Sequence, residues 1–279
     1  KGQAGRERQL EKTTHGELNL CLCGRAVDYI ETEKKDGITV LSKPEQARSD
    51  GKVAVISGAA GGIGAGVARG FLADGYAVIG IDRPATAWEA PGFRYVALDV
   101  TDDAAVAAFG AGLARVDALV NAAGINRRRE EYAMATFEAV LDVNLKGTMR
   151  LCLACRPHLS AAHGAIVNIA SMHAFFGAGH APGYAASKGG VAQLTKALAI
   201  EWAKENIRVN AIAPGWIHTA MTQPVIDDPV RNRSIMERTP LARWGKPEDL
   251  VGPALFLAGD AARFVTGVIL PVDGGYLIT

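Results

Sequence analysis

The sequence KVAVISGAAGGIGAGVARGFLADGYAVIGID, residues 52–82, contains the pattern from which the architecture can be inferred. It opens with a short apolar run, Lys52–Ser57, and closes with another, Tyr76–Asp82, and both are typical of buried β-strands. Between them a cluster of glycines leads into Gly62–Asp74, where apolar residues recur on one helical face. The stretch therefore predicts a strand, a tight turn, a helix and a second strand parallel to the first.

The same alternation continues toward the end of the chain. Further apolar runs predict strands at Phe93–Leu98, Ala118–Asn121, Ala165–Ala170, Arg208–Ile212 and Val268–Val272. Helical spacing predicts helices at Asp102–Leu113, Phe137–Leu159 and Tyr184–Lys204. Strands that are apolar throughout and alternate with helices are typical of a parallel sheet covered on both faces. We therefore predict an α/β fold with a doubly wound parallel sheet of the Rossmann type.

The first 50 residues lack this pattern. They carry balanced charge and a polar end, SKPEQARSD, with one short strand predicted at Gly37–Leu41. We predict a single Rossmann-type domain over residues 51–279 and an N-terminal extension of unknown role over residues 1–50.

Composition and charge exclude several functional classes. The chain has 279 residues and a net charge of +1, which creates no strong field toward nucleic acid or an anionic membrane. No apolar run reaches the roughly 18 residues that a membrane span needs. We therefore expect a cytoplasmic protein that acts on a small-molecule substrate, with no nucleic-acid or membrane partner.

The four cysteines fall in two close pairs. Cys152 and Cys155 lie in an apolar helical stretch, so we predict two buried, reduced and inert thiols. Cys21 and Cys23 have His15 as a third candidate ligand for zinc, but a fourth ligand is missing. We therefore predict no metal site.

The glycine-rich turn, SGAAGGIG at Ser57–Gly64, has the form of a phosphate-binding loop. Only a chain without Cβ atoms turns this tightly and brings its amides against a pyrophosphate, and the helix N-terminus adds positive charge. Asp82 ends the next strand, where a carboxylate can accept hydrogen bonds from the adenosine ribose and would repel a 2′-phosphate. The turn predicts a dinucleotide cofactor, with NAD favoured over NADP. Arg83 keeps NADP open, because a guanidinium pairs well with phosphate.

Tyr184 and Lys188 stand at i and i+4 and share one helical face. A free phenol has a pKa near 10, so it is a poor base at pH 7 unless a nearby cation stabilises the phenolate. Lys188 and an oxidised nicotinamide are two such cations. The pair is therefore a candidate for proton transfer with a substrate oxygen.

These motifs together resemble the short-chain dehydrogenase/reductase family, from Gly51 to near the C-terminus. SGAAGGIG resembles the family's TGxxxGxG loop, with Ser57 in place of threonine. NAAG at Asn121–Gly124 resembles its NNAG motif, with Ala122 in place of the second asparagine. The resemblance implies that the cofactor is contacted by Ser57, Gly58, Gly62, Ile63, Gly64, Asp82, Asp99, Val100, Asn121, Ala122, Gly124, Tyr184, Lys188, Pro214, Gly215, Ile217 and Thr219.

The resemblance also implies the catalytic roles. Tyr184 exchanges the proton with the substrate oxygen, and Ser171 holds that oxygen by a hydrogen bond. Lys188 lowers the pKa of Tyr184 and binds the nicotinamide ribose. Asn144 anchors a water that relays protons. Hydride passes between the substrate carbon and the nicotinamide.

Several strings are similar to the sugar-acid dehydrogenases of this family, among them Gly124–Arg128 and Arg243–Gly245. The run Arg127–Arg129, with Arg127 as the substrate-binding candidate, could attract a carboxylate, and the alternative is a solvated basic loop. His173 and His180 are candidates for binding hydroxyl groups, and the alternative is simple packing. Further candidates are Trp216, for a substrate contact, and residues 220–244, for a mobile lid over the substrate.

We predict an NAD-dependent oxidoreductase for a secondary alcohol or ketone of a sugar, sugar acid or polyol. One alternative is an NADPH-dependent 3-oxoacyl-carrier-protein reductase, against which Asp82 argues. Another is a non-catalytic dinucleotide-binding module on the same fold, although such modules commonly lose Tyr184 or Lys188 of the pair. By resemblance, the apolar C-terminal stretch Gly267–Thr279 packs in a tetramer interface, which predicts a homotetramer.

Overall fold

The computed structural model describes residues 32–35, 38–41, 51–83 and 88–279. The chain divides into two compact units, residues 1–47 and residues 48–279. In the first unit, β1 (Thr32–Lys35) and β2 (Ile38–Leu41) pair antiparallel, with Thr32 opposite Leu41. The strand predicted at residues 37–41 is thus present as β2. Its partner β1 was not predicted, because TEKK carries no apolar residue to mark it.

The second unit is built on a sheet of seven parallel strands. Their spatial order is β5-β4-β3-β6-β7-β8-β9. The strands are β3 (Val53–Ser57), β4 (Ala77–Asp82), β5 (Phe93–Ala97), β6 (Ala118–Asn121), β7 (Ala165–Ile169), β8 (Arg208–Pro214) and β9 (Ile269–Val272). The order reverses between β3 and β6, and ligands bind beyond the carboxyl ends of the strands at such a switch point. The predicted doubly wound Rossmann-type sheet is confirmed.

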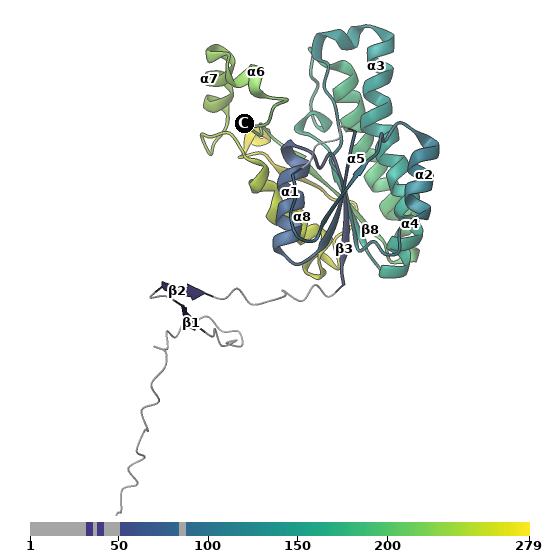
Figure 1. Ribbon diagram of the computed structural model, residues 1–279. Helices are drawn as coiled ribbons and strands as arrows, with labels where there is room; N and C mark the ends of the chain where they lie inside the picture. Colours follow the sequence, from purple (N-terminus) through teal and green to yellow (C-terminus); the bar gives the residue numbers. More distant parts are fainter. Residues whose placement is uncertain (1–31, 36–37, 42–50, 84–87) are drawn as a thin grey trace, which may run out of the picture. The chain divides into compact units, whose positions relative to one another are not determined.

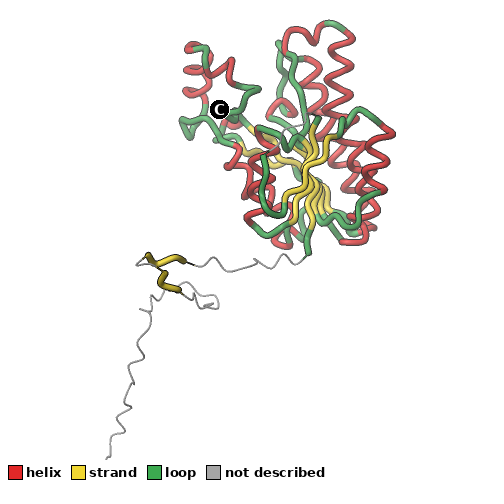
Figure 2. Tube along the Cα trace, in the orientation of Figure 1, coloured by secondary structure: helices red, strands yellow, loops and turns green. Residues whose placement is uncertain are grey.

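Helices cover both faces of this sheet (Figures 1 and 2). One layer holds α1 (Gly62–Ala73) and α8 (Val251–Ala258), and the other holds α2 (Asp103–Ala111), α4 (Gly147–Ala162) and α5 (Pro182–Trp202). Three further helices lie beyond the carboxyl ends of the strands (Figure 1). They are α3 (Met134–Leu141), α6 (Gln223–Ile226) and α7 (Pro229–Arg238). The segment predicted as a lid, residues 220–244, therefore contains two helices.

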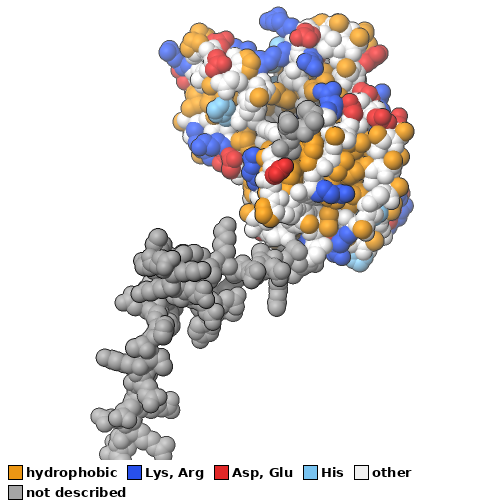
Figure 3. Space-filling view, viewed as in Figure 1, with side chains coloured by type: hydrophobic (Ala, Val, Ile, Leu, Met, Phe, Trp, Pro, Cys, Tyr) orange, Lys and Arg blue, Asp and Glu red, His pale blue; other side chains and the backbone are white. Residues whose placement is uncertain are grey.

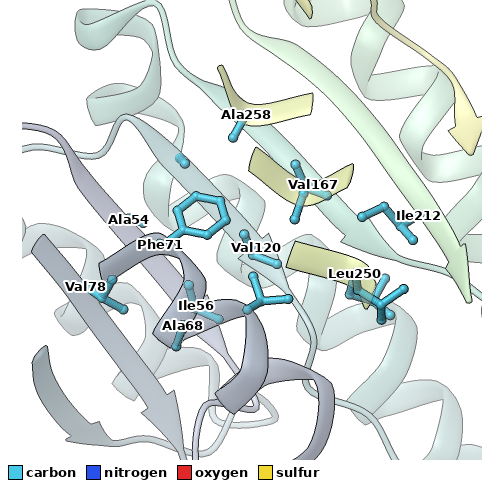
Figure 4. Close-up of a cluster of buried hydrophobic side chains, with 14 of the residues drawn as sticks. Ala54, Ile56, Ala68, Phe71, Val78, Val120, Val167, Ile212, Leu250 and Ala258 are labelled. Atoms are coloured by element: carbon cyan, nitrogen blue, oxygen red, sulfur yellow. The ribbon is translucent and has the colours of Figure 1, made fainter. Parts of the chain in front are cut away.

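Side chains alternate between the two faces along each strand. On β3, Ala54 and Ile56 belong to the core cluster against α1 and α8, whereas Val55 belongs to the opposite cluster. Phe71 of α1 is fully buried at the centre of the first cluster (Figure 4). Burial of such a side chain stabilises the fold by roughly 1.5–3 kcal/mol. Trp202 of α5 is likewise buried, in the second cluster.

The helix predicted over residues 137–159 is interrupted. Between α3 and α4 the chain forms a π-helical turn, Asp142–Lys146, and this widened turn holds Asn144 fully buried. Turns of this kind occur most often at functional sites. Apolar periodicity did not reveal it, because the inserted residue changes the hydrogen-bond spacing without adding a break residue.

The structure also tests the predictions about cysteines and membranes. Cys152 and Cys155 are free and buried, as predicted, and burial raises the pKa of both thiols. Cys21, Cys23 and His15 lie outside the described residues. Within the described ranges, no cluster of His, Cys, Asp or Glu could hold a metal ion, and no helix is long and apolar enough to cross a membrane.

Candidate functional site

The turn between β3 and α1 requires glycine at two positions. Gly58 has φ +70°, and a Cβ atom there would lie 2.9 Å from the backbone of Ala122 and Ala123. A Cβ atom on Gly64 would lie 2.1 Å from the carbonyl oxygen of Gly58. The turn is therefore closed against itself and against the end of β6, and no other residue fits.

A cleft of about 360 Å³ opens beside this turn. Beside it, α1 follows the N-cap residue Gly61, and no side chain caps the helix start, so the first amides of the helix remain available to a ligand. The predicted cofactor residues that line it are Gly58, Gly62, Ile63, Gly64, Asp82, Asp99, Val100, Ala122, Gly124 and Thr219. Bare glycine backbone at a helix N-terminus suits a pyrophosphate, so the residues present fit a dinucleotide.

Asp82 lies at the carboxyl end of β4, on the rim of the cleft. Its Oδ2 accepts a hydrogen bond from the Ala60 amide at 3.1 Å, and its Oδ1 accepts one from the Arg83 amide at 2.8 Å. The Arg83 guanidinium is exposed and lies 4.0 Å from the carboxylate of Asp99. This part of the cleft thus has a carboxylate held by backbone amides and an exposed guanidinium paired with Asp99.

The other predicted cofactor residues do not line the cleft: Ser57, Asn121, Tyr184, Lys188, Pro214, Gly215 and Ile217. Ser57 is buried, and its hydroxyl accepts hydrogen bonds from the amides of Ala122 and Ala123, both at 3.1 Å. Asn121 is also buried and donates to the side chain of Asn168 at 2.8 Å. Both side chains hold the ends of β3, β6 and β7 together rather than facing a ligand.

The opposite wall of the cleft begins after β8. Gly215 packs so closely on Asp273 that a Cβ atom would lie 2.6 Å from its Cα atom. Ile217 is buried, and its carbonyl accepts a hydrogen bond from the Thr222 hydroxyl at 2.6 Å. Thr219 then faces Gly62 across the cleft, with its Cγ2 atom 3.5 Å from where a Cβ of Gly62 would lie. Pro214 is the last residue of β8 and does not reach the cleft.

Ser171, Tyr184 and Lys188 come together at the carboxyl end of β7. Ser171 follows that strand, and its hydroxyl hydrogen-bonds to Tyr184 and accepts from the His173 amide at 3.2 Å. Lys188 lies one turn along α5, with its Nζ 5.7 Å from the centre of the Tyr184 ring. This Nζ is buried and donates to the carbonyl of Ile169 at 2.6 Å.

The protein's own groups raise the pKa of Tyr184. Burial raises it most, the hydrogen bond with Ser171 lowers it, and the charge of Glu131 raises it. At pH 7 the phenol is therefore protonated and can donate to a carbonyl oxygen. The lowered pKa that alcohol oxidation needs stays a prediction, and it depends on the cationic charge of an oxidised nicotinamide.

Asn144 hydrogen-bonds both to the segment after β6 and to α5, which carries Tyr184 and Lys188. Its Oδ1 accepts from the Ile125 amide at 2.8 Å, and its Nδ2 donates to the Ile125 carbonyl at 2.9 Å and to the Ser187 hydroxyl at 3.0 Å. The π-helical turn thereby ties the segment after β6 to α5. Gly124 packs closely against the π-helical turn and against α5, because a Cβ atom there would be 3.3 Å from Asn144 and 3.6 Å from Lys188.

Replacing Lys188 with methionine is expected to raise the Tm at pH 7 by about 2–6 °C. Burial lowers the pKa of Lys188 to about 8, so the folded state holds an ammonium in an unfavourable place. The gain is reduced by loss of the hydrogen bond to Ile169, which leaves about 1–2 kcal/mol. Calorimetry of both proteins measures the difference.

The pH dependence of this difference has a definite sign. Between about pH 8 and the unfolded pKa near 10.5, the folded protein has already lost the Lys188 proton while the unfolded chain still binds it. The stability of the unmodified protein therefore rises with pH in this window, and the advantage of the methionine variant shrinks. Lys196→Met, at an exposed position on the same helix, should change Tm by less than about 2 °C. A Lys188→Met variant less stable than the parent at pH 7 would contradict the argument.

The two arginines Arg127 and Arg128 differ in exposure. Arg127 is exposed, whereas Arg128 is half-buried, has φ +46°, and donates to the carbonyl of Met221 in the lid segment at 3.4 Å. Burial lowers the pKa of Arg128, and the charge of Arg231 on α7 adds to this. Of the two arginines, Arg128 is therefore the one in contact with the lid.

The histidines lie close to the proton-transfer group. The His173 ring is 6.1 Å from the Tyr184 ring and 6.2 Å from the His180 ring. Burial lowers the pKa of His173 to about 4, so this ring is neutral at pH 7. Burial also lowers the pKa of His180, followed by the charges of Arg128 and Arg231. Trp216 packs its ring on Trp244 and Tyr276 and lines a separate cavity of about 180 Å³.

Sequence reasoning missed two side chains that hold the site. Trp88 stacks on Phe93 and donates from Nε1 to the carbonyl of Ala59 in the glycine turn at 3.0 Å. Glu131 is 1% exposed and accepts backbone hydrogen bonds from Arg127 and Tyr184, both at 2.8 Å. The sequence carries no signal for either, since an indole or a carboxylate in a polar segment is ordinary at the surface.

Comparison with known proteins gives a consistent result. The family model described as enoyl-(acyl carrier protein) reductase matches residues 58–277. The chain is 42% identical to 2-dehydro-3-deoxy-D-gluconate 5-dehydrogenase of Bacillus subtilis, over 81% of this chain and 95% of the relative. It is 42% identical to galactitol 2-dehydrogenase (L-tagatose-forming) of Cereibacter sphaeroides, over 83% and 97%.

A solved structure is similar over the same part of the chain. Gluconate 5-dehydrogenase of Burkholderia cenocepacia, in complex with NADP and tartrate, superposes with a TM-score of 0.76 at 34% identity, over 82% of this chain and 96% of that one. The chain therefore spans nearly the full length of each of these relatives.

Proposed function

Since the chain belongs to the short-chain dehydrogenase/reductase family, we propose that it transfers a hydride between NAD and a secondary alcohol or ketone of a sugar, sugar acid or polyol, through Ser171, Tyr184 and Lys188. It is an NAD(P)-dependent oxidoreductase that acts on a CH–OH group, as its relatives are. A non-catalytic binding module is therefore excluded. The observation that carries the proposal is the meeting of the glycine cleft and the Ser171, Tyr184 and Lys188 group at one edge of the sheet.

The protein's residues divide the work of the reaction. Ser171 and Tyr184 hydrogen-bond to the substrate oxygen, and the Tyr184 phenolate takes up the alcohol proton during oxidation, whereas the Tyr184 phenol donates its proton during reduction. Lys188, which here donates to the Ile169 carbonyl, would hold the nicotinamide ribose of a bound cofactor and stabilise the phenolate. Asn144 holds the segment after β6 in place and anchors the water of a proton relay. A bound nicotinamide supplies the hydride acceptor.

The preference for NAD rests on Asp82. Its carboxylate is held by two backbone amides at the rim of the cleft, where it would bind the adenosine ribose of NAD and repel a 2′-phosphate. The relative from Burkholderia cenocepacia binds NADP, and Arg83 is exposed and close enough to serve such a phosphate here. NADP is therefore the alternative cofactor.

The preference for an anionic substrate rests on the arginines. Lys and Arg side chains gather where the lid helices and the segment before α3 face each other across a hollow (Figure 3). Besides burial, the charges of Arg128, Arg231 and Arg129 lower the pKa of His180, whose ring lies 6.2 Å from the His173 ring next to Tyr184. Arg128 and Arg231 would bind the carboxylate, while His173 and His180 meet hydroxyl groups. The relative that binds tartrate agrees with a carboxylate-bearing ligand.

The oligomeric state and the cellular location are also part of the proposal. Ile278 is 87% exposed in the C-terminal segment, and a second copy of the chain would cover it in a homotetramer. The free thiols of Cys152 and Cys155 suit the reducing cytoplasm. A monomeric mass of the protein in light scattering would overturn the proposed homotetramer.

The test is turnover on a panel of sugar acids, polyols and 3-oxoacyl thioesters, each with NAD and NADP, followed by nicotinamide absorbance. We expect turnover with NAD on a sugar acid or polyol. Replacing Asp82 with asparagine should then raise the ratio of kcat/KM for NADP to that for NAD at least about tenfold, because a like charge is removed.

Asp74→Asn is the matched control, since it removes an exposed carboxylate at the far end of α1. It should leave the cofactor ratio unchanged. Turnover only with NADPH on 3-oxoacyl thioesters would instead support the carrier-protein reductase.

A further inference from the structure

Glu131 is a buried carboxylate that bridges two parts of the site. It lies in a short 3-10 turn, Arg128–Tyr132, and is 1% exposed. Its Oε1 accepts from the backbone amide of Arg127, at the start of the arginine segment. Its Oε2 accepts from the backbone amide of Tyr184, in the first turn of α5. One side chain thus joins the substrate side to the proton-transfer residue.

The first turn of α5 is shaped to receive this carboxylate. Pro182 at the start of the helix has no amide hydrogen, so the amide of Tyr184 is among the first that need an outside acceptor. A negative charge at a helix N-terminus is also favoured by the helix dipole. Gly183 leaves room for it, because a Cβ atom there would lie 3.3 Å from Oε2 of Glu131.

A buried carboxylate is an energetically costly way to join these two segments. Burying a carboxylate is costly, and hydrogen bonds from two amides offset that cost only while both remain in place. A second link between the same segments, from the Tyr132 hydroxyl to the carbonyl of Gly179, lies at the surface and does not touch α5. The buried link is therefore the one that sets the distance between Arg127 and Tyr184.

We propose that Glu131 is a positioning residue that holds the arginine segment and the Tyr184 hydroxyl in register, so that a substrate bound by its carboxylate presents its alcohol to the phenol. This inference rests on the proposed function of Tyr184. Glu131 does not touch the substrate. It acts through the backbone of the two segments that do.

Glu131→Gln tests the proposal in the full chain. A glutamine oxygen can accept from one amide, but its NH2 group then faces the other amide, so one link is lost. We expect kcat to fall about tenfold or more and the KM for the sugar acid to rise, while the KM for NAD stays within about twofold. Glu131→Asp keeps two acceptor oxygens and should restore part of kcat.

A pH profile separates positioning from general damage. Tyr184 is faced by Ser171, Lys188, His173 and the charge of Glu131, and the last of these raises its pKa. Removing that charge should move the limb of the kcat profile that reports Tyr184 to lower pH. Glu130→Gln removes an exposed neighbouring charge and should leave kcat, KM and the profile unchanged.

The outcomes are distinguishable. Unchanged kcat in Glu131→Gln, or losses of kcat, NAD binding and Tm together with no shift of the profile, would overturn the positioning role. No turnover by the parent protein on any substrate would overturn the proposed function instead. In that case hydrogen exchange of the Tyr184 amide still tests its hydrogen bond to Glu131. This amide should exchange faster in Glu131→Gln than in the parent protein, and equal rates would refute the link.

Discussion

Replacing Tyr184 with phenylalanine is expected to lower kcat about a thousandfold while leaving NAD binding within about twofold. In the proposed mechanism the hydroxyl is the group that exchanges a proton with the substrate oxygen, and the ring without it still fills the half-buried space beside His173. Steady-state rates at saturating substrate, with NAD affinity from tryptophan fluorescence, measure both quantities.

Tyr132→Phe is the matched control for this variant. It removes the hydroxyl of a tyrosine that is 70% exposed and hydrogen-bonds only to the carbonyl of Gly179. Its kcat should stay within about twofold of the parent value. Retention of more than about a tenth of the parent kcat by Tyr184→Phe would mean that another group carries the proton.

Replacing Gly64 with alanine is expected to abolish dinucleotide binding and to lower the free energy of unfolding by about 3 kcal/mol or more. The added methyl group would lie 2.1 Å from the carbonyl oxygen of Gly58, and both atoms belong to backbone that cannot rotate away. The turn must open, which moves the amides that face the pyrophosphate. Calorimetry and fluorescence titration with NAD follow the two effects.

Gly61→Ala gives the contrast within the same turn. Gly61 has φ −162°, an extended conformation open to any residue, and a Cβ atom there would meet nothing within 4 Å. The change should cost less than about 1 kcal/mol, the usual difference at a helix N-cap. Equal stability of the two alanine variants would show that the close approach at Gly64 is not rigid.

Sequence patterns were most informative where a residue type has one physical use. Apolar runs of strand length can only be buried, so the seven-stranded sheet and its helical layers were predictable. The glycine turn was predictable because only glycine allows its backbone geometry. The i and i+4 spacing of Tyr184 and Lys188 likewise follows from the helical repeat, and both side chains do meet at one sheet edge.

Patterns were silent where the decisive contact joins segments far apart in the chain. The π-helical turn at Asn144 is held by the backbone of Ile125, and the buried Glu131 is held by the backbone amide of Tyr184, and no local rule links these positions. The helices α6 and α7 were also missed, since their composition is that of a solvated segment.

The amino-acid sequence by itself therefore determined the sheet and the glycine turn, and it predicted which groups react. Tertiary structure alone decided that Ser57 and Asn121 hold strands together rather than face a ligand, that Arg128 rather than Arg127 reaches the lid, and that the protein's own groups raise the pKa of Tyr184. The reason is physical. Propensity and periodicity act over a few neighbouring residues, whereas burial, hydrogen-bond partnership and electrostatic environment are properties of the packed molecule.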